Sequence, residues 1–131
     1  MDLLPQIEVS FLLTSDEDYI DKISDTLSIN PSKTRRKESF KLQEFAHTMW
    51  EFSSGKENSK AIVNQFNKLL IVLKDKEDRI KELMKNNNIK SYFVVSIHAE
   101  NGDGPEITLT REIIKFAEKI DAEIDFDIYY Y

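Results

Sequence analysis

The most distinctive chemical pattern in the sequence lies near its end, where acidic side chains alternate with apolar ones and three tyrosines follow. Glu123, Asp125 and Asp127 occupy every second position, and Tyr129, Tyr130 and Tyr131 follow. On a strand these acids share one face and recur every ~7 Å, so neighbouring carboxylates repel by roughly 0.5 kcal/mol in water. Carboxylates beside tyrosines suit a surface that contacts a basic protein. The candidate partner-binding residues are Glu123, Asp125, Asp127, Tyr129, Tyr131 and, from a preceding turn, Asp103.

Other interpretations of this acidic pattern stay open. The acids can simply keep a solvated sheet face soluble, or the side chains of another strand can cover them. A predicted helix over residues 15–28 carries a second acidic group, which is the next surface to consider for a basic partner. Its members are Asp16, Glu17, Asp18, Asp21 and Asp25.

Residue types that support catalysis or metal binding are sparse. The chain has no Cys, three Gly and two His, and His47 and His98 lack the spacing of a helical metal site. Neither a Gly-rich phosphate loop nor a Gly-x-Ser-x-Gly nucleophile motif occurs. The sequence therefore predicts a protein that is not an enzyme and uses no metal and no cofactor. A hydrolase that uses His98 with nearby carboxylates is the alternative.

The charge distribution favours a protein partner over a nucleic acid. The 131 residues have a net charge of −6, and residues 100–131 hold 9 of the 24 acids but 3 of the 18 bases, which leaves 15 of each elsewhere. An acidic region of this kind raises the encounter rate with a basic partner. The opposing basic run, Lys33 to Lys41, is short and has one aromatic residue, so we expect no nucleic-acid binding.

Length and hydropathy predict a single cytoplasmic domain over residues 1–131. This length suffices to bury one self-sufficient core. No apolar run approaches the ~18 residues of a membrane span, and the first residues lack the basic and apolar regions of an export signal. We therefore expect no membrane contact.

Alternating apolar residues predict strands over 6–14, 89–99 and 122–130. In the last of these, Ala122, Ile124, Phe126, Ile128 and Tyr130 are expected to face the core. The middle one is apolar on both faces, which favours a central strand. Shorter strands are expected over 48–52, with Trp50 in the core, and over 106–109.

Apolar residues at helical spacing predict a helix over 15–28, capped by Ser15, and a last helix capped by Thr110. Residues 57–87 are expected to form two helices separated by the charged stretch 74–78, one long bent helix being the alternative. Residues 32–46 are weakly patterned and are expected to form the longest loop.

The resulting order is β-α-β-α-α-β-(β)-α-β. It predicts an α+β fold with one mainly antiparallel four- to five-stranded sheet and helices packed mostly on one face. Each outer strand–helix–strand unit is expected to make a right-handed crossover.

Four segments together resemble a bacterial domain-of-unknown-function family, number four-two-seven-nine. They are Ile23 to Pro31, Trp50 to Phe52, the helical pair leading into Tyr92 to His98, and Leu109 to Tyr129. The resemblance covers most of the chain and implies a small bacterial α/β domain without an established activity. The family pattern has a Gly where Asp121 stands here. It also has a basic, Gly-containing loop before the Trp, whereas the loop of this chain is basic without Gly.

We therefore expect an immunity protein, which binds and neutralises a cognate bacterial toxin, here a basic nuclease, through an acidic surface. The alternative is a small-molecule-binding or regulatory domain with an apolar pocket between sheet and helices.

Overall fold

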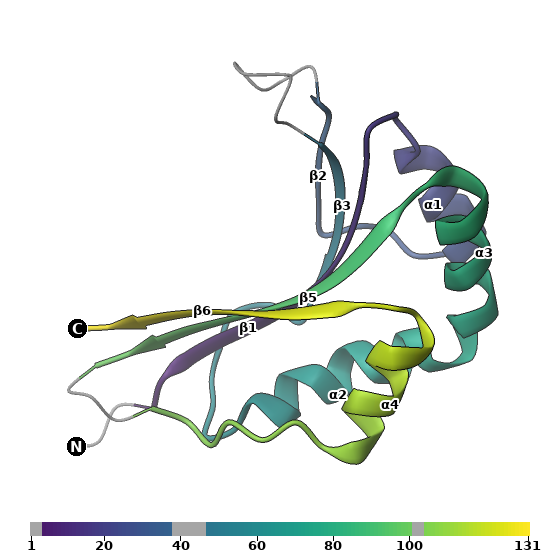
Figure 1. Cartoon of the computed structure of the whole chain (residues 1–131). Helices are drawn as coiled ribbons and strands as arrows, with labels where there is room; N and C mark the ends of the chain where they lie inside the picture. The colour runs from purple at the N-terminus through teal and green to yellow at the C-terminus, as the bar shows by residue number, and fades with distance from the viewer. Residues whose placement is uncertain (1–3, 38–46, 101–103) are drawn as a thin grey trace.

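The computed structural model describes residues 4–37, 47–100 and 104–131, which form one sheet with helices along one side (Figure 1). The strands are β1 (Gln6–Ser15), β2 (Lys33–Arg35), β3 (Thr48–Ser53), β4 (Glu57–Asn58), β5 (Lys90–Ala99) and β6 (Glu123–Tyr130). The helices are α1 (Ile20–Leu27), α2 (Ile62–Leu73), α3 (Glu77–Asn87) and α4 (Arg111–Lys119), and a 3-10 turn, η3 (Lys74–Lys76), joins α2 to α3.

The sheet order is β2-β3-β1-β5-β6, and β4 pairs with the start of β1. All pairs are antiparallel except β5 and β6. This mixed, mostly antiparallel sheet confirms the predicted α+β fold. It is wider than expected, because β2 forms within the predicted loop and β4 within the predicted start of a helix. The strand expected over 106–109 is reduced to a single bridge between Ala61 and Glu106.

The core lies between the two central strands and the helices. Phe93 of β5 is buried at its centre, and its ring centroid lies 5.2 Å from that of Phe11, 5.5 Å from Phe66 and 6.4 Å from Phe116. These rings come from β1, β5, α2 and α4, so one aromatic cluster ties the sheet to two helices. Trp50 is fully buried, as the sequence predicts.

Of the two predicted helix caps, one is confirmed and the other is wrong. The Thr110 hydroxyl accepts a hydrogen bond from the Ile113 N–H (3.3 Å), which confirms this cap of α4. Ser15 does not cap α1: it ends β1, and its hydroxyl donates to the Glu17 carbonyl. Asp18 is the residue that accepts from the Ile20 N–H at the start of α1 (3.1 Å). The strand thus includes Ser15, which the sequence pattern assigns to the helix, and α1 begins only at Ile20.

The two outer strand–helix–strand units differ. β1 and β3 are antiparallel neighbours, so the first unit makes no crossover and that prediction is wrong. β5 and β6 are parallel neighbours connected through α4, as a crossover requires. The helical stretch after β4 divides as predicted, at Lys74–Lys76.

Most of β6 lies outside the core, contrary to the prediction from its apolar residues. Phe126, Ile128 and Tyr130 are 40%, 38% and 58% exposed instead of buried. The reason is the length of α4, which lies beneath the start of β6 while the rest of the strand extends beyond it (Figure 1). Ile124, at the covered end, is half-buried and packs against the core.

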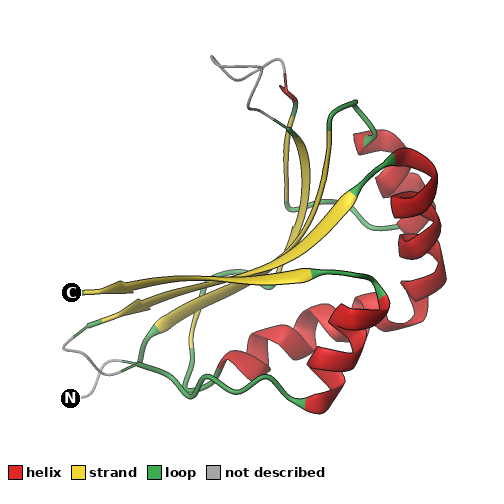
Figure 2. Cartoon of the chain, viewed as in Figure 1, coloured by secondary structure: helices red, strands yellow, loops and turns green. Residues whose placement is uncertain are grey.

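The sheet has one face without helices. Figure 2 shows all the helices of the described residues on the other side. We call the helix-free side the open face. None of the helices in the described ranges has the length and apolar character needed to cross a membrane.

Candidate functional site

The open face brings together acids that are far apart in the sequence. Asp127 pairs with Ser96 of β5, and Ser96 pairs in turn with Glu8 of β1. Paired residues on adjacent strands direct their side chains to the same face. The register therefore places Glu8, Asp125 and Asp127 on one surface, and Glu51 joins them from β3 through its pairing with Leu12.

The two inner acids, Glu8 and Glu51, lie in a partly desolvated environment. Burial raises the pKa of Glu51 above its ordinary value of 4.5, and the charge of Glu8 raises it further, while Lys33 opposes the shift. The Ser53 hydroxyl donates to the Glu8 carboxylate (2.5 Å). Among the described residues no group of three or more His, Asp and Glu is placed to hold a metal ion. Glu8 and Glu51 together favour a cationic group beside them on the open face.

The outer acids form what we call the acidic row: Glu123, Asp125 and Asp127 on β6. All three are exposed. None of them takes part in an ion pair within the described part of the chain. The Tyr129 hydroxyl donates to Asp127 (3.0 Å), and this hydrogen bond raises the pKa of Tyr129. The acidic row thus presents carboxylates that have no basic partner among the described residues.

An aromatic cluster, made of His98, Tyr129 and Tyr131, adjoins the acidic row. The His98 ring stacks on Tyr129, with centroids 4.7 Å apart and planes at 17°, and is nearly parallel to Tyr131 at 6.0 Å. His98 Nδ1 lies 3.1 Å from the Tyr131 hydroxyl. Tyr131 is 71% exposed, so the cluster offers flat apolar surface with polar groups at its rim.

The structure brings five of the six predicted partner-binding residues together, while Asp103 lies outside the described residues. Sequence reasoning missed Glu8, Glu51 and His98 as neighbours of this surface. The alternation of side chains along each strand indicates which face of that strand these residues occupy. Which strands are adjacent was not visible in the sequence.

The second acidic group, near α1, is already engaged. Arg36 donates to Asp18 (2.6 Å) and lowers its pKa. His47 lies 3.3 Å from Asp16, and the Tyr19 hydroxyl donates to Glu17 (2.9 Å). Three of its five acids therefore have partners within the domain, which makes the acidic row the more available surface.

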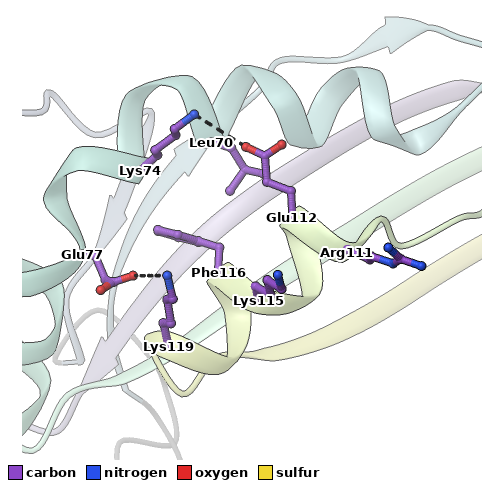
Figure 3. Close-up of a pocket in the computed structure, with 8 residues that line it drawn as sticks. All are labelled: Leu70, Lys74, Glu77, Arg111, Glu112, Lys115, Phe116 and Lys119. Carbon is purple, nitrogen blue, oxygen red and sulfur yellow. Dashed lines mark ion pairs between the residues drawn. The ribbon is translucent and has the colours of Figure 1, made fainter.

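A groove of about 360 Å³ between α2, η3 and α4 is a separate candidate site (Figure 3). Buried Leu70 and Phe116 form its apolar floor. Two ion pairs cross its rim, Lys74–Glu112 (3.8 Å) and Lys119–Glu77 (3.7 Å). Arg111 and Lys115 also line it, so its cations outnumber its acids by four to two. The groove suits a small anion with an apolar body, and it lies between helices instead of between sheet and helices.

Comparison with known proteins gives one match. The family model described as "Domain of unknown function (DUF4279)" matches residues 5–131. No curated protein and no solved structure matches the chain. The matched range contains the acidic row and the aromatic cluster.

Proposed function

This chain belongs to the DUF4279 family of domains of unknown function, and we propose that it is an immunity protein that binds and neutralises a basic bacterial toxin domain, a nuclease. It acts as a binding protein, not as an enzyme, in the cytoplasm. It needs no metal, cofactor, nucleic acid or membrane.

One observation carries the proposal: the acidic row has no basic partner within the described residues and adjoins an exposed aromatic cluster. Carboxylates spaced ~7 Å apart on a strand repel one another, and lysines or arginines of a partner relieve that repulsion. Charges of this kind increase the association rate, because they steer the encounter.

The aromatic cluster supplies apolar contact area, which the charged side chains do not. Stacked rings bury apolar area with little loss of side-chain freedom, and tyrosine is enriched among residues that dominate binding energy. His98 and Tyr131 hold one another in place through their polar atoms. The acids therefore set the rate of encounter, and the rings set the lifetime of the complex.

The test uses the toxin domain encoded beside the gene, or a partner isolated with this protein as bait, in stopped-flow association. We expect Asp125→Asn/Asp127→Asn to slow association roughly tenfold in dilute salt, and the difference to disappear near 0.5 M salt, where screening is nearly complete. The matched control is Asp21→Asn/Asp25→Asn, which makes the same charge change on α1. An unchanged rate and salt dependence in the β6 variant would refute the proposal.

A second candidate function, binding of a small anionic molecule, is favoured by the groove between α2 and α4. Its apolar floor and excess of cations suit a medium-chain carboxylate. Octanoate should raise the melting temperature and perturb Phe116 resonances, octylamine should not, and Arg111→Gln/Lys115→Gln should abolish the effect. Lys90→Gln, at a lysine that does not line the groove, is the control. Equal effects of octanoate and octylamine would exclude this function.

A further inference from the structure

The outer edge of β6 pairs with no other strand in the described part of the chain. β6 is the last strand in the sheet order, and no described strand pairs with its far side. The Tyr131 N–H donates to the Ala99 carbonyl of β5 (3.0 Å). Backbone groups alternate in direction along a strand. Odd-numbered residues of β6 therefore bond to β5, and the N–H and C=O groups of Phe126, Ile128 and Tyr130 point to the free edge.

The same three residues carry exposed apolar side chains on the helix side of the sheet, beyond the end of α4. The acidic row lies on the opposite face of the strand. β6 thus presents unpaired backbone groups along its edge, apolar side chains on one face and carboxylates on the other. Native proteins usually cover or interrupt edges of this length, so an open one marks an interaction surface.

We propose that a protein partner docks by adding a strand to the free edge of β6, and that lysines or arginines alternate with apolar residues in this strand. The proposal rests on the function proposed above, because it uses the same acidic row. The basic side chains of the added strand lie opposite Asp125 and Asp127, while its apolar side chains contact Phe126 and Ile128. Main-chain hydrogen bonds provide affinity, and the alternation provides specificity.

Charge argues against a second copy of this chain as the occupant. In an antiparallel pairing of two β6 edges the outward-pointing even residues must lie opposite one another. Odd residues then also face odd residues, and in the two registers with the longest overlap an aspartate faces an aspartate: Asp125 opposite Asp127, or Asp127 opposite Asp127. Like charges directly opposite one another destabilise a strand pair. A basic strand has the complementary pattern.

The first test uses two capped synthetic decapeptides: alternating Lys and Val, and a block peptide of five Lys followed by five Val. We expect the alternating peptide to bind at least tenfold more tightly and to slow amide exchange at Phe126 and Ile128 about tenfold. Exchange at Asp125 and Asp127 should change little, because those amides already bond to β5. Equal binding of the two peptides, or protection without this alternation, would overturn the proposal.

The second test uses the whole domain with one altered backbone group. Ile128→Pro removes an outward N–H without removing a hydrogen bond to β5, as edge strands allow. It should weaken binding of the alternating peptide about fivefold, the factor for one net hydrogen bond. Ile128→Thr keeps the N–H and should retain most of the affinity. The circular dichroism spectrum and the exchange pattern of the free Pro variant check that it remains folded.

Two outcomes distinguish a failure of the strand-addition proposal from a failure of the proposed function. If Asp125→Asn/Asp127→Asn slows association with the toxin domain but Ile128→Pro leaves its affinity unchanged, strand addition is overturned and the immunity role stands. If the protein forms a dimer that Ile128→Pro dissociates, a second copy occupies the edge and the inference is also overturned.

Discussion

A hydrogen bond from the Trp50 indole to Ser24 joins β3 to α1 and allows a quantitative test of the fold. Trp50 Nε1 lies 3.0 Å from Ser24 Oγ, Trp50 is fully buried, and Ser24 is half-buried. Ser24→Ala leaves the indole N–H without its acceptor. An unsatisfied buried donor costs about 1–3 kcal/mol. Because Ser24 is half-exposed, water can partly replace it, so we expect a loss of about 1–2 kcal/mol in the free energy of unfolding.

Urea unfolding followed by tryptophan fluorescence measures this loss, because Trp50 is the sole Trp. With a slope of about 1–3 kcal/mol per molar urea, the midpoint should fall by roughly 0.3–2 M. Asp25→Ala, at an exposed position of the same helix, is the control and should change the stability by less than about 0.5 kcal/mol.

A double-mutant cycle shows whether the hydrogen bond is the cause. Trp50→Phe removes the donor, so Ser24→Ala should then cost little, and circular dichroism replaces fluorescence as the readout. The coupling energy should be about 1 kcal/mol. If Ser24→Ala costs the same in both backgrounds, the loss comes from packing of α1 and the reasoning fails.

Three further predictions concern other positions. The raised pKa of Glu51 means that the folded protein binds a proton at this carboxylate more tightly than the unfolded chain does. The free energy of unfolding therefore falls as pH rises from 4.5 through the folded pKa. Glu51→Gln should stabilise the protein in urea titrations at about pH 7 and lose that advantage at about pH 3. Asp121 has a φ of 52°, where a residue with a side chain is strained. Asp121→Gly should therefore increase the free energy of unfolding by about 0.5 kcal/mol, after the higher entropy that Gly gives the unfolded chain is subtracted. The melting temperature should rise by about 1–3 °C. Phe93→Ala should cost about 3–5 kcal/mol in urea unfolding, whereas Phe126→Ala, in the neighbouring strand but 40% exposed, should cost less than about 1.5 kcal/mol; similar losses would contradict the assignment of the core.

The regular elements could be predicted because burial leaves a period in the sequence. β5 alternates between buried and half-buried residues from Ser91 to Ala99, and the sequence pattern has the same period. One departure of this chain from the family pattern can also be interpreted physically. The Gly that its pattern places at the position of Asp121 suits the left-handed backbone found there.

The remaining features depend on neighbours that a sequence pattern does not identify. β2 has three exposed residues and no apolar period, and it exists because it pairs with β3. The apolar period of β6 predicts the strand, but α4 does not extend far enough to cover Phe126 and Ile128, which are therefore exposed. Glu8 joins the site only through strand register, which connects it to Asp127 by way of Ser96.

The separation of charge between the two sides of β6 and α4 gives this part of the molecule an electric dipole moment. Carboxylates of the acidic row lie on the open face, while the lysines and Arg111 of the groove lie on the helix side. An approaching positive body is attracted to one side and repelled by the other, and this produces a torque before contact. The torque turns the acidic side toward such a body during diffusion, so for the partner proposed above the binding orientation is enriched before any side chains meet.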